Sequence, residues 1–146
     1  MSNDRALVDT NIIVYATDVT SIYHARAKVF LEHMIPSKKL VVTIQNLTEL
    51  YALLTNKKKI PRYLTPSEAQ RFLAAIMHGG DYTVITPTSQ TPMRLLSLLK
   101  SYPAKGAEVH DVYLAAVMTD HGVSTIYTAD TSVFKKLKLN AINPFV

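Results

Sequence analysis

The stretch ALVDTNIIVY at residues 6–15 decides how we interpret the rest of the chain. Its first three residues are apolar and predict a strand buried on both faces. Residues 11–16 predict a short helix. Thr10 or Asn11 is the expected N-cap, because a side-chain oxygen there can accept from free N–H groups of the first turn. Asp9 would then stand at the carboxyl end of a central strand, where open α/β sheets place their chemistry.

Strands and helices are expected to alternate along the remaining chain. Further strands are predicted at residues 40–42, 82–85, 125–128 and 141–142, and further helices at residues 21–34, 44–55, 66–78, 91–100, 108–121 and 131–137. Such alternation indicates a parallel sheet with right-handed crossovers. We expect residues 1–146 to form one α/β domain, with three α/β/α layers around a central, mostly parallel sheet.

Local signals predict where several helices begin and end. Ser21 and Thr43 are the expected N-caps of the helices that follow them, and Pro66 suits the first position of a helix. Gly122 is the expected C-cap of the helix at residues 108–121.

The composition is typical of a folded protein, with 48% apolar and 18% charged residues. The chain has no cysteine, which excludes disulfides and thiolate metal sites. We expect a cytoplasmic protein without a membrane partner, because its longest apolar run, residues 112–118, is far too short to span a bilayer. The net charge of +5 favours a polyanion partner only slightly. No glycine-rich phosphate loop is present, which argues against the common nucleotide-binding sites.

Four acidic residues lie at positions close to the predicted core, where an unpaired carboxylate is destabilising. Asp9 and Asp130 follow predicted strands, Glu49 lies within an apolar helix, and Asp111 lies in the first turns of another helix. Buried carboxylates are destabilising unless they are paired or bind a cation. An all-oxygen set favours Mg²⁺ or Mn²⁺ over zinc. Each acid also has a plain alternative: Asp9 and Asp130 could cap helices, Asp111 could serve the helix dipole, and Glu49 could be solvated.

Other charged residues are interpreted more simply. Lys57, Lys58, Lys59 and Arg62 could bind RNA phosphates, although such a run is more often a solvated loop. Six further acids are expected to be solvated: Asp4, Asp18, Glu32, Glu68, Asp81 and Asp120.

The chain resembles the PIN-domain ribonucleases, and within them the small VapC-type toxins of toxin–antitoxin pairs. The resemblance rests on four segments and one further residue: VDTN at residues 8–11, LTEL at 47–50, DVYLAA at 111–116, YTAD at 127–130, and Phe134. One departure is visible, because many relatives carry another acid shortly after the last aspartate, where this chain has Thr131, Ser132 and Val133.

The resemblance implies Mg²⁺-dependent cleavage of single-stranded or loop RNA by an endoribonuclease. Asp9, Glu49, Asp111 and Asp130 would hold the metal as the catalytic carboxylates, and Thr10, Asn11 and Thr128 would orient water or carboxylates. It also implies a small antitoxin protein as partner. The apolar second and third helices could form a homodimer contact, as in the family, or belong to the core.

Three other functions remain open from the sequence. A housekeeping PIN nuclease in RNA processing would share the whole site. A phosphatase of the haloacid-dehalogenase kind also places an aspartate after its first strand, but needs a second acid at the position of Asn11. A non-catalytic binding module would use the acids for a structural ion or for a partner's arginine.

Overall fold

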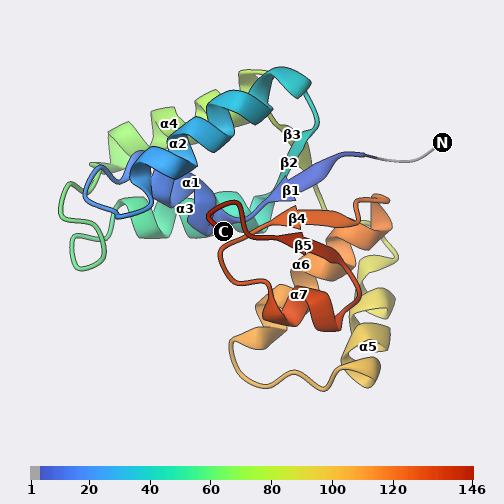
Figure 1. The fold of residues 1–146 in the computed structure, drawn as a ribbon. Helices are drawn as coiled ribbons and strands as arrows, with labels where there is room; N and C mark the ends of the chain where they lie inside the picture. Colours follow the sequence, from blue (N-terminus) through green and yellow to red (C-terminus); the bar gives the residue numbers. More distant parts are fainter. Residues whose placement is uncertain (1–3) are drawn as a thin grey trace.

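The computed structural model describes residues 4–146 and confirms the alternation of strands and helices (Figure 1). The strands are β1 (Ala6–Val8), β2 (Leu40–Thr43), β3 (Thr83–Ile85), β4 (Thr125–Tyr127) and β5 (Asn140–Ile142). The helices are α1 (Thr10–Thr17), α2 (His24–Met34), α3 (Ile44–Leu54), α4 (Pro66–His78), α5 (Thr91–Ser101), α6 (Glu108–Asp120) and α7 (Ser132–Lys136), with a short 3₁₀ helix η1 (Ile35–Ser37) after α2.

The five strands form one sheet with the order β3-β2-β1-β4-β5, and every neighbouring pair is parallel. β1 lies at the centre, where Leu7 pairs with Val41 of β2 and with Ile126 of β4. The chain therefore adds β2 and β3 on one side of β1 first, and adds β4 and β5 on the other side later. This reversal leaves a crevice beyond the carboxyl ends of β1 and β4, the usual ligand position in open parallel sheets.

Alternate residues of β1 and β2 face two separate apolar clusters. Val8 and Val42 pack with residues of α1, α2, α3 and α4. Leu7 and Val41 pack with residues of α6 and α7. Because side chains alternate between the faces of a strand, the two clusters lie on opposite faces of the sheet. The predicted three-layer α/β/α architecture is confirmed.

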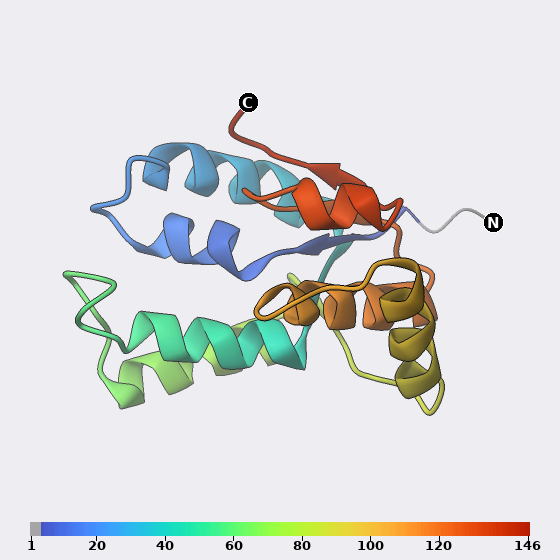
Figure 2. The ribbon, with the colours of Figure 1, turned by 90° about the horizontal axis from the view of Figure 1, so that it is seen from below.

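The helices within each layer pack on one another as well as on the sheet. α3 and α4 lie side by side (Figure 2). α5 packs against α6, on the outside of the second layer (Figure 1). Within residues 4–146, no helix combines the length and apolar character that crossing a membrane requires.

Two predicted N-caps are wrong. Asp9 caps α1 in place of Thr10 or Asn11, because its carboxylate accepts from the Thr10 N–H at 2.8 Å. α2 begins at His24, three residues after Ser21, because the Ser21 hydroxyl accepts from the Tyr23 N–H at 3.1 Å within the preceding turn.

Other predicted helix ends are close to those observed. Thr43 caps α3 through a capping box with Asn46, as expected for its position. α6 ends at Asp120 with His121 as C-cap, one residue before the predicted Gly122. Gly122 takes the next position with φ 69°, a left-handed conformation that glycine adopts without strain.

Candidate active site

The four acids singled out from the sequence line one cavity at the carboxyl edge of the sheet. Asp9 follows β1, Asp130 follows β4, Glu49 lies on α3, and Asp111 lies on α6. We call this space the acid cavity. It has a volume of about 260 Å³, and its other lining residues are Thr10, Asn11, Leu53 and Phe134.

Asp9 is the most constrained of the four acids. Its backbone N–H donates to the Tyr127 carbonyl at 2.9 Å, which joins the ends of β1 and β4. One carboxylate oxygen accepts from the Thr10 N–H at 2.8 Å, and the other accepts from the Thr128 hydroxyl at 2.7 Å. Burial raises the pKa of Asp9 above its ordinary value, although both hydrogen bonds act in the opposite direction.

Glu49 is held by two side chains that reach it from different directions. The Thr10 hydroxyl donates to its Oε2 at 3.2 Å, and the Gln45 amide donates to its Oε1 at 3.0 Å. Thr10 is positioned in turn by Asn46, whose amide donates to the Thr10 hydroxyl at 3.2 Å. Asn46 is buried and also completes the capping box of α3 with Thr43. The start of α3 and the start of α1 are therefore tied together beside Glu49.

Sequence analysis missed both Gln45 and Asn46. Asn46 carries a recognisable signal, because it stands three residues after the cap residue Thr43, as in a capping box. Gln45 lies one turn before Glu49 on the same helix, a spacing at which side chains meet.

Asp130 is the exposed member of the set. Its carboxylate accepts from the Ser132 hydroxyl at 3.0 Å and from the Ser132 N–H at 3.3 Å. Ser132 belongs to residues 131–133, the segment between Asp130 and Phe134. In this chain that segment places a hydroxyl donor beside Asp130.

Asp111 is partly buried at the start of α6, and its environment opposes ionisation. Burial raises the pKa of Asp111 to about 6, and the negative charges of Asp9, Asp130, Glu49 and Glu108 contribute in the same direction. Within residues 4–146, no three His, Asp or Glu side chains are already arranged as a metal site. The four carboxylates share a cavity, and the pKa is raised for two of them, Asp9 and Asp111.

Comparison with known proteins identifies the family. The sequence matches the family model of the PIN domain over residues 6–139. The chain belongs to the PIN domain family. No curated protein matches it significantly in sequence.

Several solved structures have the same fold as this PIN domain. VapC20 of Mycobacterium tuberculosis, described as a Sarcin-Ricin loop cleaving toxin, is 19% identical with a TM-score of 0.66, over 92% of this chain and 95% of that one. A toxin–antitoxin complex from Klebsiella pneumoniae is 18% identical with a TM-score of 0.63, over 95% and 97% of the two chains. VapBC2 from Rickettsia felis, bound to a DNA fragment from its promoter, is 16% identical with a TM-score of 0.67, over 94% and 97%. At these identities the similarity establishes the fold.

The supporting polar residues lie at or beside the acid cavity of the PIN domain. Thr10 and Asn11 line it, and the Asn11 side chain accepts from the Ala129 N–H at 3.5 Å. Thr128 is fully buried behind Asp9 and does not line the cavity.

The basic residues of the α3–α4 connection are exposed. The acid cavity is not lined by Lys57, Lys58 or Arg62, and neither is the cavity that adjoins it at Asn11 and Leu53. Lys59 lines an adjoining cavity of about 350 Å³, which shares Asn11 and Leu53 with the acid cavity.

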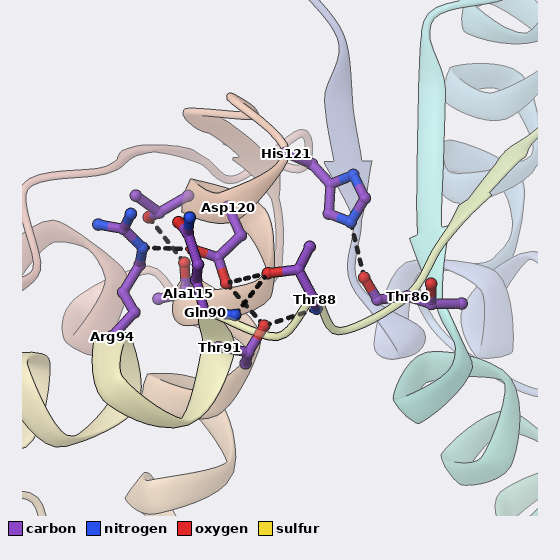
Figure 3. A network of polar contacts seen from close by, with 9 residues as sticks. Thr86, Thr88, Gln90, Thr91, Arg94, Ala115, Asp120 and His121 are labelled. Carbon is purple, nitrogen blue, oxygen red and sulfur yellow. Dashed lines mark hydrogen bonds and ion pairs between the residues drawn. The ribbon is translucent and has the colours of Figure 1, made fainter.

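The prediction that Asp120 is solvated is wrong. Only 1% of its side chain is exposed. It accepts from the Thr91 hydroxyl at 2.6 Å and the Thr88 hydroxyl at 3.3 Å, and it forms an ion pair with Arg94 (Figure 3). Burial alone would raise the pKa of Asp120, but the bonds from Thr91 and Arg94 outweigh it and lower the pKa. The network joins the β3–α5 turn to the end of α6.

Proposed function

We propose that this PIN domain is a Mg²⁺-dependent endoribonuclease and the toxin of a VapBC-type toxin–antitoxin pair. The observation that carries the proposal is the convergence of Asp9, Glu49, Asp111 and Asp130 on one cavity. The cavity lies at the crevice where the strand order reverses, which is the expected place for chemistry in such a sheet.

The donor set of the acid cavity fits a hard divalent cation. Its ionisable lining residues are four carboxylates, and within residues 4–146 neither Lys nor Arg lines it. Mg²⁺ and Mn²⁺ prefer carboxylate oxygen. Burial and carboxylate repulsion together raise the pKa of Asp111, and a bound cation relieves the repulsion. A bound Mg²⁺ supplies a water of lowered pKa and neutralises charge that develops on the phosphate.

The protein's own hydrogen bonds hold these carboxylates in fixed orientations. Thr128 and the Thr10 N–H fix the two oxygens of Asp9, and Thr10 and Gln45 fix those of Glu49. Ser132 restrains the exposed Asp130. Fixed ligands lose little conformational freedom when a cation and a phosphate bind, which favours an arrangement suited to hydrolysis. Lys59 lines the adjoining cavity, and we infer that its ammonium group contacts an RNA phosphate.

Structural relatives support the biological part of the proposal. VapC20 is described as a Sarcin-Ricin loop cleaving toxin, and the Klebsiella structure is described as a toxin–antitoxin complex. We infer a small antitoxin protein as partner, and a homodimer as the assembly. α2 offers an apolar surface for protein contacts, where 65% of Val29 is exposed beside a cavity of about 500 Å³.

The first experiment compares RNA cleavage by the wild-type protein and by Asp9→Asn, each with and without Mg²⁺. We expect cleavage that requires the cation and is lost in the variant, because Asp9 is the acid fixed between β1 and β4. Glu32→Gln on the exposed surface of α2 is the matched control and should cleave normally. Cleavage that survives both EDTA and the Asp9 substitution would contradict the proposal.

The toxin role needs a separate measurement. Expression of the wild-type chain should arrest bacterial growth, and the protein of an adjoining small gene should relieve that arrest. Cleavage without any effect on growth would favour a housekeeping role in RNA processing.

A further inference from the structure

A second cavity lies beside the acid cavity, between α3 and α6. We call it the side cavity. It has a volume of about 490 Å³ and a mainly apolar lining. Its walls include Ile44, Gln45 and Glu49 of α3 and His110, Tyr113 and Val117 of α6. Glu49 lines both cavities, so they adjoin at one carboxylate.

Helical spacing explains why one pair of helices lines two different spaces. On α6, His110, Tyr113 and Val117 follow one another at intervals of three and four residues, so they share a face. Asp111 directly follows His110, so it lies on a different face of α6 and lines the acid cavity instead. On α3, Gln45 donates to both Glu49 and the His110 carbonyl, at 3.0 and 3.3 Å. Gln45 thus bridges the two helices where the cavities meet.

The chemistry of the side cavity matches a planar heterocycle with N–H groups at its edge. The Tyr113 ring and the apolar side chains of Ile44 and Val117 provide surfaces for a flat ring. Gln45 Oε1 is buried, and among residues 4–146 it has no hydrogen-bond donor. Gln45 lines this cavity, and a buried acceptor without a donor gains when a ligand brings an N–H to it. The volume also lies within the range of roughly 300–1,000 Å³ usual for small-molecule sites.

We propose that the side cavity binds the base of a nucleotide next to the phosphate held at the acid cavity, with Tyr113 as the stacking residue. This inference rests on the proposed action on RNA and extends it to recognition of the substrate. Continuity through Glu49 favours a nucleotide over a second copy of the chain, because a strand with its phosphate at the acids passes directly by this opening.

The test measures binding with RNA that stays intact. In the Asp9→Asn background, a short single-stranded RNA carries one 2-aminopurine, moved a position at a time along the strand. We expect fluorescence quenching at one position, because the base stacks there. Adding Tyr113→Ala should abolish that quenching and weaken binding by roughly tenfold, the usual size of one base–aromatic contact. Tyr113→Phe retains the ring and should behave like the parent protein, as should Tyr63→Ala at an exposed tyrosine.

An abasic substitution at the quenched position completes a double-mutant cycle. RNA lacking that base should bind the Tyr113→Ala protein and its parent equally, a result that general damage to the fold would not produce. Equal weakening with and without the base would overturn the inference. So would quenching that does not depend on Tyr113, or a Tyr113→Ala protein that changes from dimer to monomer while quenching persists, since the cavity would then be a contact between copies.

Failure of the proposed base site can be distinguished from failure of the proposed nuclease activity. If the wild-type protein cleaves RNA but quenching is independent of Tyr113, the nuclease stands and the base site falls. If quenching depends on Tyr113 but no RNA is cleaved, the base site stands and the nuclease falls.

Discussion

Hydroxyl groups orient the carboxylates of the acid cavity. Thr128 is fully buried and donates its single proton to Asp9, while Thr10 reaches Glu49. The convergence of the four acids on one cavity could be predicted, because two follow strands of a parallel sheet and two lie on helices with apolar neighbours, although Asp9 also caps α1. Gln45 and Asn46 were not predicted. Spacing along α3 indicates their contacts with Glu49 and Thr43, but their contacts with His110 and Thr10 depend on how α3 packs against α6 and α1.

Removal of the Thr128 hydroxyl should lower activity. Thr128→Val keeps the shape of the side chain but leaves one oxygen of Asp9 without its 2.7 Å donor. Loss of such a supporting contact costs about 10- to 100-fold in metal affinity or activity. Cleavage rates measured across a Mg²⁺ titration should show this loss. Thr119→Val, whose hydroxyl bonds only within its own helix, is the control and should retain full activity.

Asp111 should make the metal-free protein less stable as the pH rises. Its pKa is raised to about 6 from an ordinary value of 3.8, so between these values the folded state binds more protons than the unfolded state. Stability therefore falls as pH increases through this window. Asp111→Asn removes the effect, so in EDTA its gain in Tm over wild type should be larger at about pH 8 than at about pH 4. An equal gain at both pH values would contradict the assigned cause.

At the level of elements, α6 is fixed at both ends by polar groups. Its start contributes Asp111 to the acid cavity, and its end carries Asp120 in the network with Thr88, Thr91 and Arg94. The apolar spacing of α6 predicted the helix and its buried face. The role of Asp120 could not be predicted, because the turn that covers the end of α6 comes from a distant part of the sequence.

Asp120→Ala should destabilise the protein by about 2–3 kcal/mol, as expected for loss of hydrogen bonds to a charged group. Urea unfolding above about pH 5 should show it, because the pKa of Asp120 is lowered on folding and its contribution disappears as the pH falls. Asp81→Asn, in an exposed pair with Lys38, should change stability little. A loss of the same size in both variants would argue against a special role for the buried acid.

For the whole molecule, the sequence predicted the alternating elements and the parallel direction of the strands. Strand order could not be predicted from it, because short apolar strands such as β1 and β2 do not specify their neighbours. The order β3-β2-β1-β4-β5 nevertheless explains the site, since it sets the ends of β1 and β4 side by side. Asp9 and Thr128 meet across a separation of 119 positions for this reason.

The ribosome synthesises β4 after β1, α3 and α6, and this order has a consequence for the unfinished chain. A growing chain that has not yet produced β4 already contains Asp9, Glu49 and Asp111, but lacks Thr128 and Asp130. Such a nascent chain has no complete set of carboxylates and no hydroxyl to orient the first aspartate. The proposed cleavage of RNA therefore requires that β4 and the residues after it have been synthesised and folded.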